Sequence, residues 1–196
     1  MEEKKILVTY AVPEELVDIQ WDENVEFLYV RTGIGKVKSA HYVTSLILNF
    51  QPDAVLNIGT AGSVQHNIGD VFCCTQFVDR NLEEVSEALN LGSVIDTSLT
   101  LMEKGIAQHW PNRGGICNTG DSFVTSAEGI KGDVIDMEAF AQAFVCEQMD
   151  IPFISVKCVT DIVGNNSVKE WKEKLAEANE KLDDFLNNKI KTFYTK

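Results

Sequence analysis

A strand-helix-strand unit at residues 132–164 constrains the fold of this chain more than any other stretch. A short extended segment leads to Asp136, and apolar residues at helical spacing predict a helix at 138–149. After Pro152 a strongly apolar run predicts a buried strand that ends near Asp161. Strands joined in this way indicate an α/β sheet, and ligands of open α/β sheets bind at the carboxyl ends of the strands.

Acidic residues lie at the ends of both strands of this unit. Asp136 and Glu138 are two residues apart in an extended segment, so their side chains can point to one side while Met137 points to the other. A carboxylate in this place can accept hydrogen bonds from adjacent hydroxyls of a ribose. Asp161 follows a strongly apolar strand, a setting that favours a protonated carboxyl group able to donate its proton. A structural interpretation has equal weight, because an aspartate after a strand is often a helix N-cap or a turn residue.

Strands and helices alternate along the rest of the chain. Apolar runs predict strands at 4–10, 25–30, 53–58, 71–78 and 115–119. Helical patterns cover 37–50, 97–110 and 169–190; we expect the last to be a solvated outer helix and the acidic stretch 82–92 to be irregular. Neither a linker nor an internal repeat interrupts the alternation, so we expect one α/β domain, residues 1–196, with a largely parallel sheet.

Four further segments place small, polar or aromatic residues near the ends of predicted strands. A proline-led helical turn puts Glu15 beyond the first strand, although a helix-dipole partner is the commoner role of such a residue. The turn with Gly33 and Ile34 has neither a dinucleotide fingerprint nor a P-loop, but its backbone N–H groups can meet an anion or a hydroxyl. Small residues at 59–62 let the backbone approach a ligand, and Thr60 adds a hydroxyl. Phe123 is either a core residue or a stacking surface for a planar base.

The composition limits the partners and the compartment. A net charge of −13 disfavours nucleic acid and anionic membranes as partners, and no apolar run is long enough to span a bilayer. The acidic N-terminus is unlike a signal peptide, and the five cysteines lack zinc-finger spacing and fit reduced cytoplasmic thiols. The isolated histidines His41, His66 and His109 predict no metal site, and we expect the glycosylation motif at 165–167 to be a chance match.

Seven short motifs in order along nearly the whole chain together resemble the nucleoside phosphorylase and nucleosidase superfamily. Within it, the nearest likeness is to the 5'-methylthioadenosine/S-adenosylhomocysteine nucleosidases. The motifs are AVPEE at 11–15, TGIGKV at 32–37, NIGTAG at 57–62, GD at 69–70, TGDSFV at 119–124, DMEA at 136–139 and TD at 160–161. The resemblance implies a nucleoside phosphorylase-like fold, a single-domain three-layer sandwich in which helices flank a mixed, mostly parallel sheet. It also implies a cytoplasmic homodimer that needs no cofactor.

The resemblance assigns a role to each residue of a substrate site. Asp161 would be the general acid at N7 of a purine, and Glu15 would activate the attacking water. Glu138 would hold the ribose hydroxyls with Met137 packed under the sugar, and Asp136 stands where the family often has glutamate. The remaining substrate-binding residues would line the sugar or hold the base: Gly33, Ile34, Thr60, Ala61, Gly62, Phe123 and Val124.

The sequence favours hydrolysis over phosphorolysis. Relatives that use phosphate carry an arginine where this chain has Asn57, although Arg31 and Arg80 remain as candidate anion ligands. Lys157 replaces an arginine that is common near the catalytic aspartate, and the segments 15–31 and 81–115 are shorter than in the family, which leaves the 5' substituent of the substrate open. The leading hypothesis is therefore a purine nucleosidase that hydrolyses the N-glycosidic bond of an adenine nucleoside. The alternatives are a purine nucleoside phosphorylase, a non-catalytic nucleoside-binding module and a flavodoxin-like cofactor protein.

Overall fold

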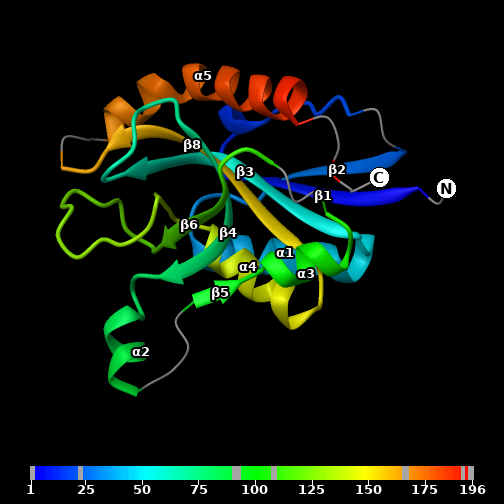
Figure 1. The fold of residues 1–196 in the computed structure, drawn as a ribbon, viewed down its shortest axis with the longest axis horizontal. Coiled ribbons are helices and arrows are strands. Elements are labelled where there is room, and N and C mark those ends of the chain that lie inside the picture. Colours follow the sequence, from blue (N-terminus) through cyan, green and yellow to red (C-terminus); the bar gives the residue numbers. More distant parts are fainter. Residues whose placement is uncertain are drawn as a thin grey trace.

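The computed structural model of the chain describes residues 3–21, 24–89, 94–106, 110–164, 168–190 and 193. A mixed eight-stranded β-sheet forms its centre, and helices cover both faces (Figure 1). Helix α5 (Val168–Asp184) lies on one face, whereas α1 (Lys36–Phe50) and α4 (Ala139–Gln148) lie on the other. The short helix α3 (Ser98–Glu103) contributes Leu101 to the apolar core on the α5 side. The predicted α/β fold with helices flanking a mixed sheet is confirmed.

The sheet starts with parallel strands and then closes on itself. Strand β1 (Lys4–Tyr10) pairs in parallel with β2 (Val25–Arg31) and with β3 (Ala54–Ser63). The other strands are β4 (Val71–Asp79), β5 (Val94–Asp96), β6 (Arg113–Thr119), β7 (Val134–Asp136) and β8 (Phe153–Ile162). β8 runs parallel to β3 and antiparallel to β4, β4 pairs with β6, and β6 pairs with β7. Because β7 also pairs with the end of β3, the strands β3, β8, β4, β6 and β7 form a closed circuit.

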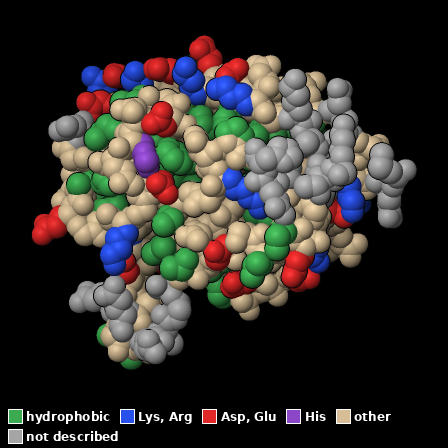
Figure 2. Space-filling view, viewed as in Figure 1, with side chains coloured by type: hydrophobic (Ala, Val, Ile, Leu, Met, Phe, Trp, Pro, Cys, Tyr) green, Lys and Arg blue, Asp and Glu red, His purple; other side chains and the backbone are tan. Residues whose placement is uncertain are grey.

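Two apolar cores lie between the sheet and its helices. On one side, Leu175, Ala178 and Leu182 of α5 are buried at helical spacing, and Ala178 and Leu182 pack with apolar residues of β1, β3 and β8. On the other side, Val43 and Ile47 of α1 pack with α4 and with the opposite face of the strands. The C-terminal helix was expected to be a solvated outer face. Its outer side fits this expectation, since charged side chains gather along the top of the molecule where α5 lies (Figure 2), but its inner side is buried.

Several predicted boundaries were wrong for local physical reasons. The helix expected at 97–110 ends at Glu103, because Gly105 adopts a left-handed φ of 72° and the Ile106 N–H bonds back to the Leu101 carbonyl. The stretch 82–92, expected to be irregular, contains helix α2 (Glu83–Leu89). Helix α5 ends at Asp184 and is followed by a π-helical segment, η2 (Phe185–Lys189).

The remaining expectations concern a histidine, a glycosylation motif, a membrane span and a metal site. His109 and the motif at 165–167 lie outside the described residues. Within the described ranges, no helix is both long and apolar enough to cross a bilayer. The same part of the chain contains no cluster of three histidine, cysteine or acidic side chains that could hold a metal ion.

Candidate active site

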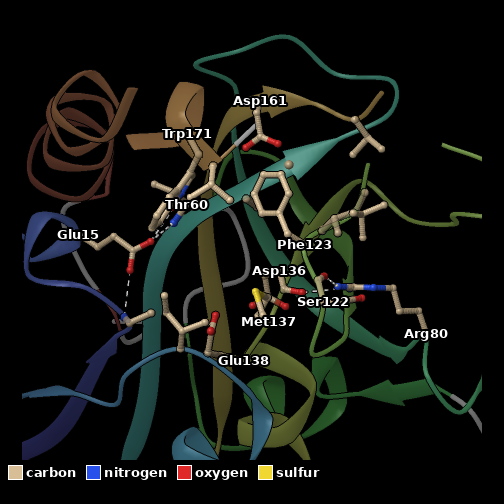
Figure 3. Close-up of a pocket in the computed structure, with 18 residues that line it drawn as sticks. Glu15, Thr60, Arg80, Ser122, Phe123, Asp136, Met137, Glu138, Asp161 and Trp171 are labelled. Carbon is tan, nitrogen blue, oxygen red and sulfur yellow. Dashed lines mark hydrogen bonds between the residues drawn. The ribbon is translucent and has the colours of Figure 1, made fainter. Parts of the chain in front are cut away.

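A cavity of about 210 Å³ opens at the carboxyl ends of β3 and β8, beside the segments that follow β1, β6 and β7 (Figure 3). Every residue predicted for the site lines this cavity except Gly33. The predicted lining residues are Glu15, Ile34, Thr60, Ala61, Gly62, Phe123, Val124, Asp136, Met137, Glu138 and Asp161. Six of the seven sequence motifs therefore converge on one pocket, and the GD motif at 69–70 is the one that contributes no lining residue. The sequence did not assign several other lining residues to it, namely Ala11, Ser122, Ile135, Val163, Val168 and Trp171.

Glu15 is held rigidly at one wall of the cavity. A short 3₁₀ turn, η1 (Pro13–Glu15), places it after β1, where it is buried. Its Oε2 accepts hydrogen bonds from the N–H groups of Ala11 (3.0 Å) and Val12 (3.2 Å). Its Oε1 accepts from the backbone N–H (2.8 Å) and the hydroxyl (2.7 Å) of Thr60. Glu15 thus caps its own turn and also reaches across to β3, on the wall of the cavity.

Glycine at position 59 makes room for this carboxylate. A Cβ on Gly59 would lie 3.1 Å from Glu15 Oε1 and 3.3 Å from Lys157 Nζ. Both approaches are tighter than ordinary van der Waals contact. The small residues of the 59–62 segment therefore let acidic and basic side chains lie directly against the strand. These small residues were expected to let a ligand approach the backbone closely. At Gly59 the groups that approach the backbone are the charged side chains of Glu15 and Lys157.

Trp171 is the lining residue that the sequence analysis missed most clearly. It lies in the first turns of α5, and its indole Nε1–H donates to the Thr60 hydroxyl oxygen at 2.9 Å. Figure 3 shows Trp171, Thr60 and Glu15 along one side of the cavity. The sequence did not indicate this role of Trp171, because an aromatic residue in a charged, amphipathic helix is expected to join the apolar face of that helix.

A buried ion pair lies beneath the acidic segment after β7. Lys157 Nζ is 3.0 Å from Asp136 Oδ2, and both side chains are at most 3% exposed. Asp136 also accepts hydrogen bonds from the Thr119 hydroxyl (2.5 Å) and from the N–H of Ala139 (2.9 Å) at the start of α4. Burial alone would raise the pKa of Asp136, but the Lys157 ammonium and these donors hold it below its usual range. Asp136 thus binds Lys157 and fixes the start of α4.

Glu138 lies at the edge of the same charged cluster. Its Oε1 accepts a hydrogen bond of 2.8 Å from the N–H of Gly35. Burial and the negative charge of Asp136 raise the pKa of Glu138 to about 8, even though Lys157 acts in the opposite direction. A carboxyl group protonated at neutral pH can both donate and accept hydrogen bonds, and a ribose diol can supply partners for both.

The glycine turn before α1 binds protein carboxylates rather than leaving its N–H groups open. The Gly35 N–H goes to Glu138, and the Lys36 N–H donates to Asp121 Oδ1 at 2.8 Å. Gly33 and Gly35 have φ values of 75° and 101°, a conformation that suits glycine. The anionic groups that the Gly35 and Lys36 N–H groups meet are thus carboxylates of the protein itself. Ile34 is the residue of this turn that lines the cavity.

Asp161 lies inside β8, one residue before its end, rather than in a turn or helix cap. It is buried, and its Oδ1 accepts a hydrogen bond of 2.8 Å from the Thr160 hydroxyl. A Cβ on Gly62 would come within 2.9 Å of Asp161 Oδ2, so a residue without a side chain is required opposite this carboxyl. In Figure 3 Asp161 lies on the same side of the cavity as the Phe123 ring.

Arg80 organises the loop that carries Phe123. Its Nη1 donates to the carbonyls of Asn118 and Asp136, both at 3.0 Å, and its Nη2 donates to those of Gly120 (2.8 Å) and Ser122 (2.6 Å). A Cβ on Gly120 would come within 2.7 Å of the Arg80 side chain. All four Nη hydrogens are thus used by backbone carbonyls. A phosphate would need these two Nη groups, and both are already bonded to the protein backbone. The hypothesis that Arg80 binds an anion through them is therefore wrong.

The other positions relevant to phosphate lie outside the cavity. Arg31 ends β2, is exposed and does not line the pocket. Asn57 is buried in β3, where its amide donates to the Thr9 hydroxyl (3.2 Å) and its Oδ1 accepts from Ser155 (2.7 Å). Its side chain therefore joins a polar network in the core. Among the described residues, carboxyl groups and aromatic rings come together around the cavity. Arg80 is the arginine that lines it, and its Nη groups are bonded to backbone carbonyls.

The chain is similar in sequence and in fold to known proteins. The chain is 30% identical to the 5'-methylthioadenosine/S-adenosylhomocysteine nucleosidase of Staphylococcus carnosus, over 87% of this chain and 83% of that protein. A crystal structure of the Helicobacter pylori nucleosidase of the same name, with butyl-thio-DADMe-Immucillin-A, has the same fold (TM-score 0.75, 24% identity, 94% of this chain and 96% of that one). The futalosine hydrolase of Helicobacter pylori is similar too (TM-score 0.75, 23% identity, 93% and 95% covered). The sequence model of the phosphorylase superfamily matches residues 19–191, and the chain belongs to that superfamily.

Proposed function

We propose that this protein is a purine nucleosidase that hydrolyses the N-glycosidic bond of an adenine nucleoside, with 5'-methylthioadenosine or S-adenosylhomocysteine as the model substrate. The observation that carries the proposal is the convergence of buried Glu15, Glu138 and Asp161 on one cavity whose other walls are largely apolar. The name of the relative from Staphylococcus carnosus points to the same chemistry.

The order of the side chains around the cavity fits a bound nucleoside. Asp161 and the Phe123 ring lie together on one side, and Met137 and Glu138 lie at the other (Figure 3). A base stacked on Phe123 would be within reach of Asp161, and the ribose would then rest on Met137 with its hydroxyls toward Glu138. Glu15, on the wall between them, would face the sugar carbon.

Each proposed role answers a chemical need. A purine anion leaves poorly, so a proton from Asp161 to N7 of the base eases its departure. The sugar gains oxocarbenium character as the bond breaks, and the Glu15 carboxylate beside it would stabilise that positive charge, as in other glycoside hydrolyses. Glu15 would orient and deprotonate the attacking water. Val163 and Val168, which also line the cavity, offer apolar surface for a 5' group.

Water is the proposed nucleophile because phosphate would lack its usual partners. A bound phosphate needs arginine or lysine side chains that present free N–H groups. The Arg80 fork is occupied by backbone carbonyls, and Asn57 is engaged in the core. The buried Lys157 is paired with Asp136.

We further propose that the protein acts as a cytoplasmic homodimer. Apolar side chains are exposed on the helices of one face of the sheet, among them Val37 and Leu48 of α1 and Phe144 of α4. All five cysteines are free and buried, as expected in a reducing compartment. Light scattering of the purified protein should give twice the mass of the 21.8 kDa chain, and a monomer at micromolar concentration would contradict the dimer.

The function is tested by base release from methylthioadenosine, adenosylhomocysteine, adenosine and inosine, each with and without phosphate. We expect adenine from one or more of the adenine nucleosides at a rate that phosphate does not change. Release that requires phosphate would mean a phosphorylase. Binding without release from any substrate would mean a nucleoside-binding module. An Asp161→Asn variant serves as the matched control for contaminating activity.

A further inference from the structure

A chain of hydrogen bonds links helix α5 to the carboxylate of Glu15. The indole Nε1–H of Trp171 donates to Thr60 Oγ1 at 2.9 Å, and Thr60 Oγ1 donates to Glu15 Oε1 at 2.7 Å. Thr60 and Glu15 are buried, and Trp171 is partly exposed on the cavity wall. The three side chains come from the C-terminal helix, from β3 and from the turn after β1, so the link joins distant parts of the chain.

The chemistry of the indole fixes the direction of this chain. Indole N–H is a donor only, so the Thr60 oxygen must act as the acceptor toward Trp171. The single hydrogen of the hydroxyl is then directed to Glu15. With the Thr60 N–H also on Oε1, and with Ala11 and Val12 on Oε2, both carboxylate oxygens are held by the protein. The orientation of this carboxylate is thereby set before any ligand binds.

We propose that Trp171 is a positioning residue for hydrolysis: through the Thr60 hydroxyl it holds the Glu15 carboxylate in the orientation that activates water. The inference rests on the proposed nucleosidase function. It assigns to α5 a part in the chemical step, in addition to its packing on β8. It also explains why a tryptophan occupies this position, because a phenylalanine would cover the cavity equally well but would donate no hydrogen bond.

A purely structural role makes different kinetic predictions. If Trp171 acts only as an apolar wall, Trp171→Phe leaves kcat unchanged and changes at most KM. If it positions Glu15, replacement lowers kcat and leaves KM nearly unchanged, because the interaction matters most in the transition state. Loss of the indole N–H should also have no further effect once the Thr60 hydroxyl is gone.

The test compares Trp171→Phe, Thr60→Val and the double variant with wild type, using methylthioadenosine as substrate. We expect Trp171→Phe to lower kcat about 2- to 10-fold, the value of one hydrogen bond, with KM changed less than about 2-fold. Thr60→Val should cost at least as much, and the double variant should cost no more than Thr60→Val alone. Trp21→Phe is the matched control, since Trp21 Nε1 donates to the Leu186 carbonyl in the core away from the cavity. This control should keep wild-type kinetics, and circular dichroism should show that every variant is folded.

Each outcome decides the matter. An unchanged kcat in Trp171→Phe, whether or not KM rises, would overturn the positioning role while leaving the nucleosidase intact. Losses that multiply in the double variant would do the same. A Trp21→Phe loss as large as that of Trp171→Phe would also overturn it, because the effect would then be a general one of stability. A wild-type protein that releases no base would overturn the proposed function, and this inference with it.

Discussion

Replacement of Lys157 by methionine tests how the acidic cluster beneath the cavity is held together. Lys157 is buried with Asp136 at 3.0 Å, and Glu138 and Glu15 are also close enough to raise the pKa of the ammonium, against the lowering effect of burial. Methionine has a similar length and fills the same space without the charge. The variant leaves the Asp136 carboxylate buried without its cation.

The cost follows from the burial of the pair. Removal of one partner of a buried ion pair typically destabilises a protein by about 3–5 kcal/mol. That is a large part of the roughly 5–15 kcal/mol by which domains are stable. The direction in which this stability difference changes with pH is defined as well. The depressed pKa of Asp136 contributes stability above its unfolded value of 3.8, and this contribution is lost as pH falls through the folded pKa. The difference between wild type and variant should therefore be largest near neutral pH and shrink below about pH 4.

Urea unfolding at pH 7, followed by circular dichroism, measures the effect. We expect Lys157→Met to lose about 3 kcal/mol or more, and the double variant Lys157→Met/Asp136→Asn to recover over half of that loss. Lys104→Met is the control, since Lys104 forms an exposed pair with Asp150 and its loss should cost under about 1 kcal/mol. A Lys157→Met variant as stable as the control would refute the argument that Lys157 neutralises this cluster.

Three further variants probe the site. Asp161→Asn should lower kcat by about 10²–10⁴-fold in the base-release assay, and near-normal turnover would refute its role as the general acid. Glu138→Gln should gain stability relative to wild type as pH rises from 5 to 8. The reason is that the pKa of Glu138 is about 8 in the folded protein and 4.5 in the unfolded chain, so ionisation of Glu138 opposes folding. An equal difference in the free energy of urea unfolding at both pH values would contradict this. Arg80→Lys cannot serve four carbonyls, so KM for the nucleoside should rise about tenfold with kcat within about threefold, and an unchanged KM would exclude a role in holding the Phe123 loop.

Much of the fold could be predicted from periodicity, because the buried strands are continuous apolar runs. The first strand was predicted with its observed bounds, and the helix predicted at 37–50 differs from α1 by one residue. The closed circuit of strands could not be predicted in the same way. It depends on a short contact between β7 and the end of β3, at Gly62 and Ile135, which no local pattern encodes.

The site shows the same division between local and long-range information. Glu15, Glu138 and Asp161 could be nominated because carboxyl groups at strand ends stand out, and the resemblance placed them in one pocket. Trp171 could not, since its partner Thr60 lies 111 positions earlier in the chain. Arg80 was assigned the wrong type of partner, because the sequence shows a guanidinium but does not show that four backbone carbonyls converge on it.

The identity of the sugar product tests the central claim most directly. The protein is incubated with methylthioadenosine and saturating phosphate, and the sugar is identified by mass spectrometry after complete release of the base. Hydrolysis at a cavity without a phosphate-binding arginine fork predicts free methylthioribose as the product. Methylthioribose 1-phosphate would contradict the account, because it would require an anion site among residues that this structure commits to other partners.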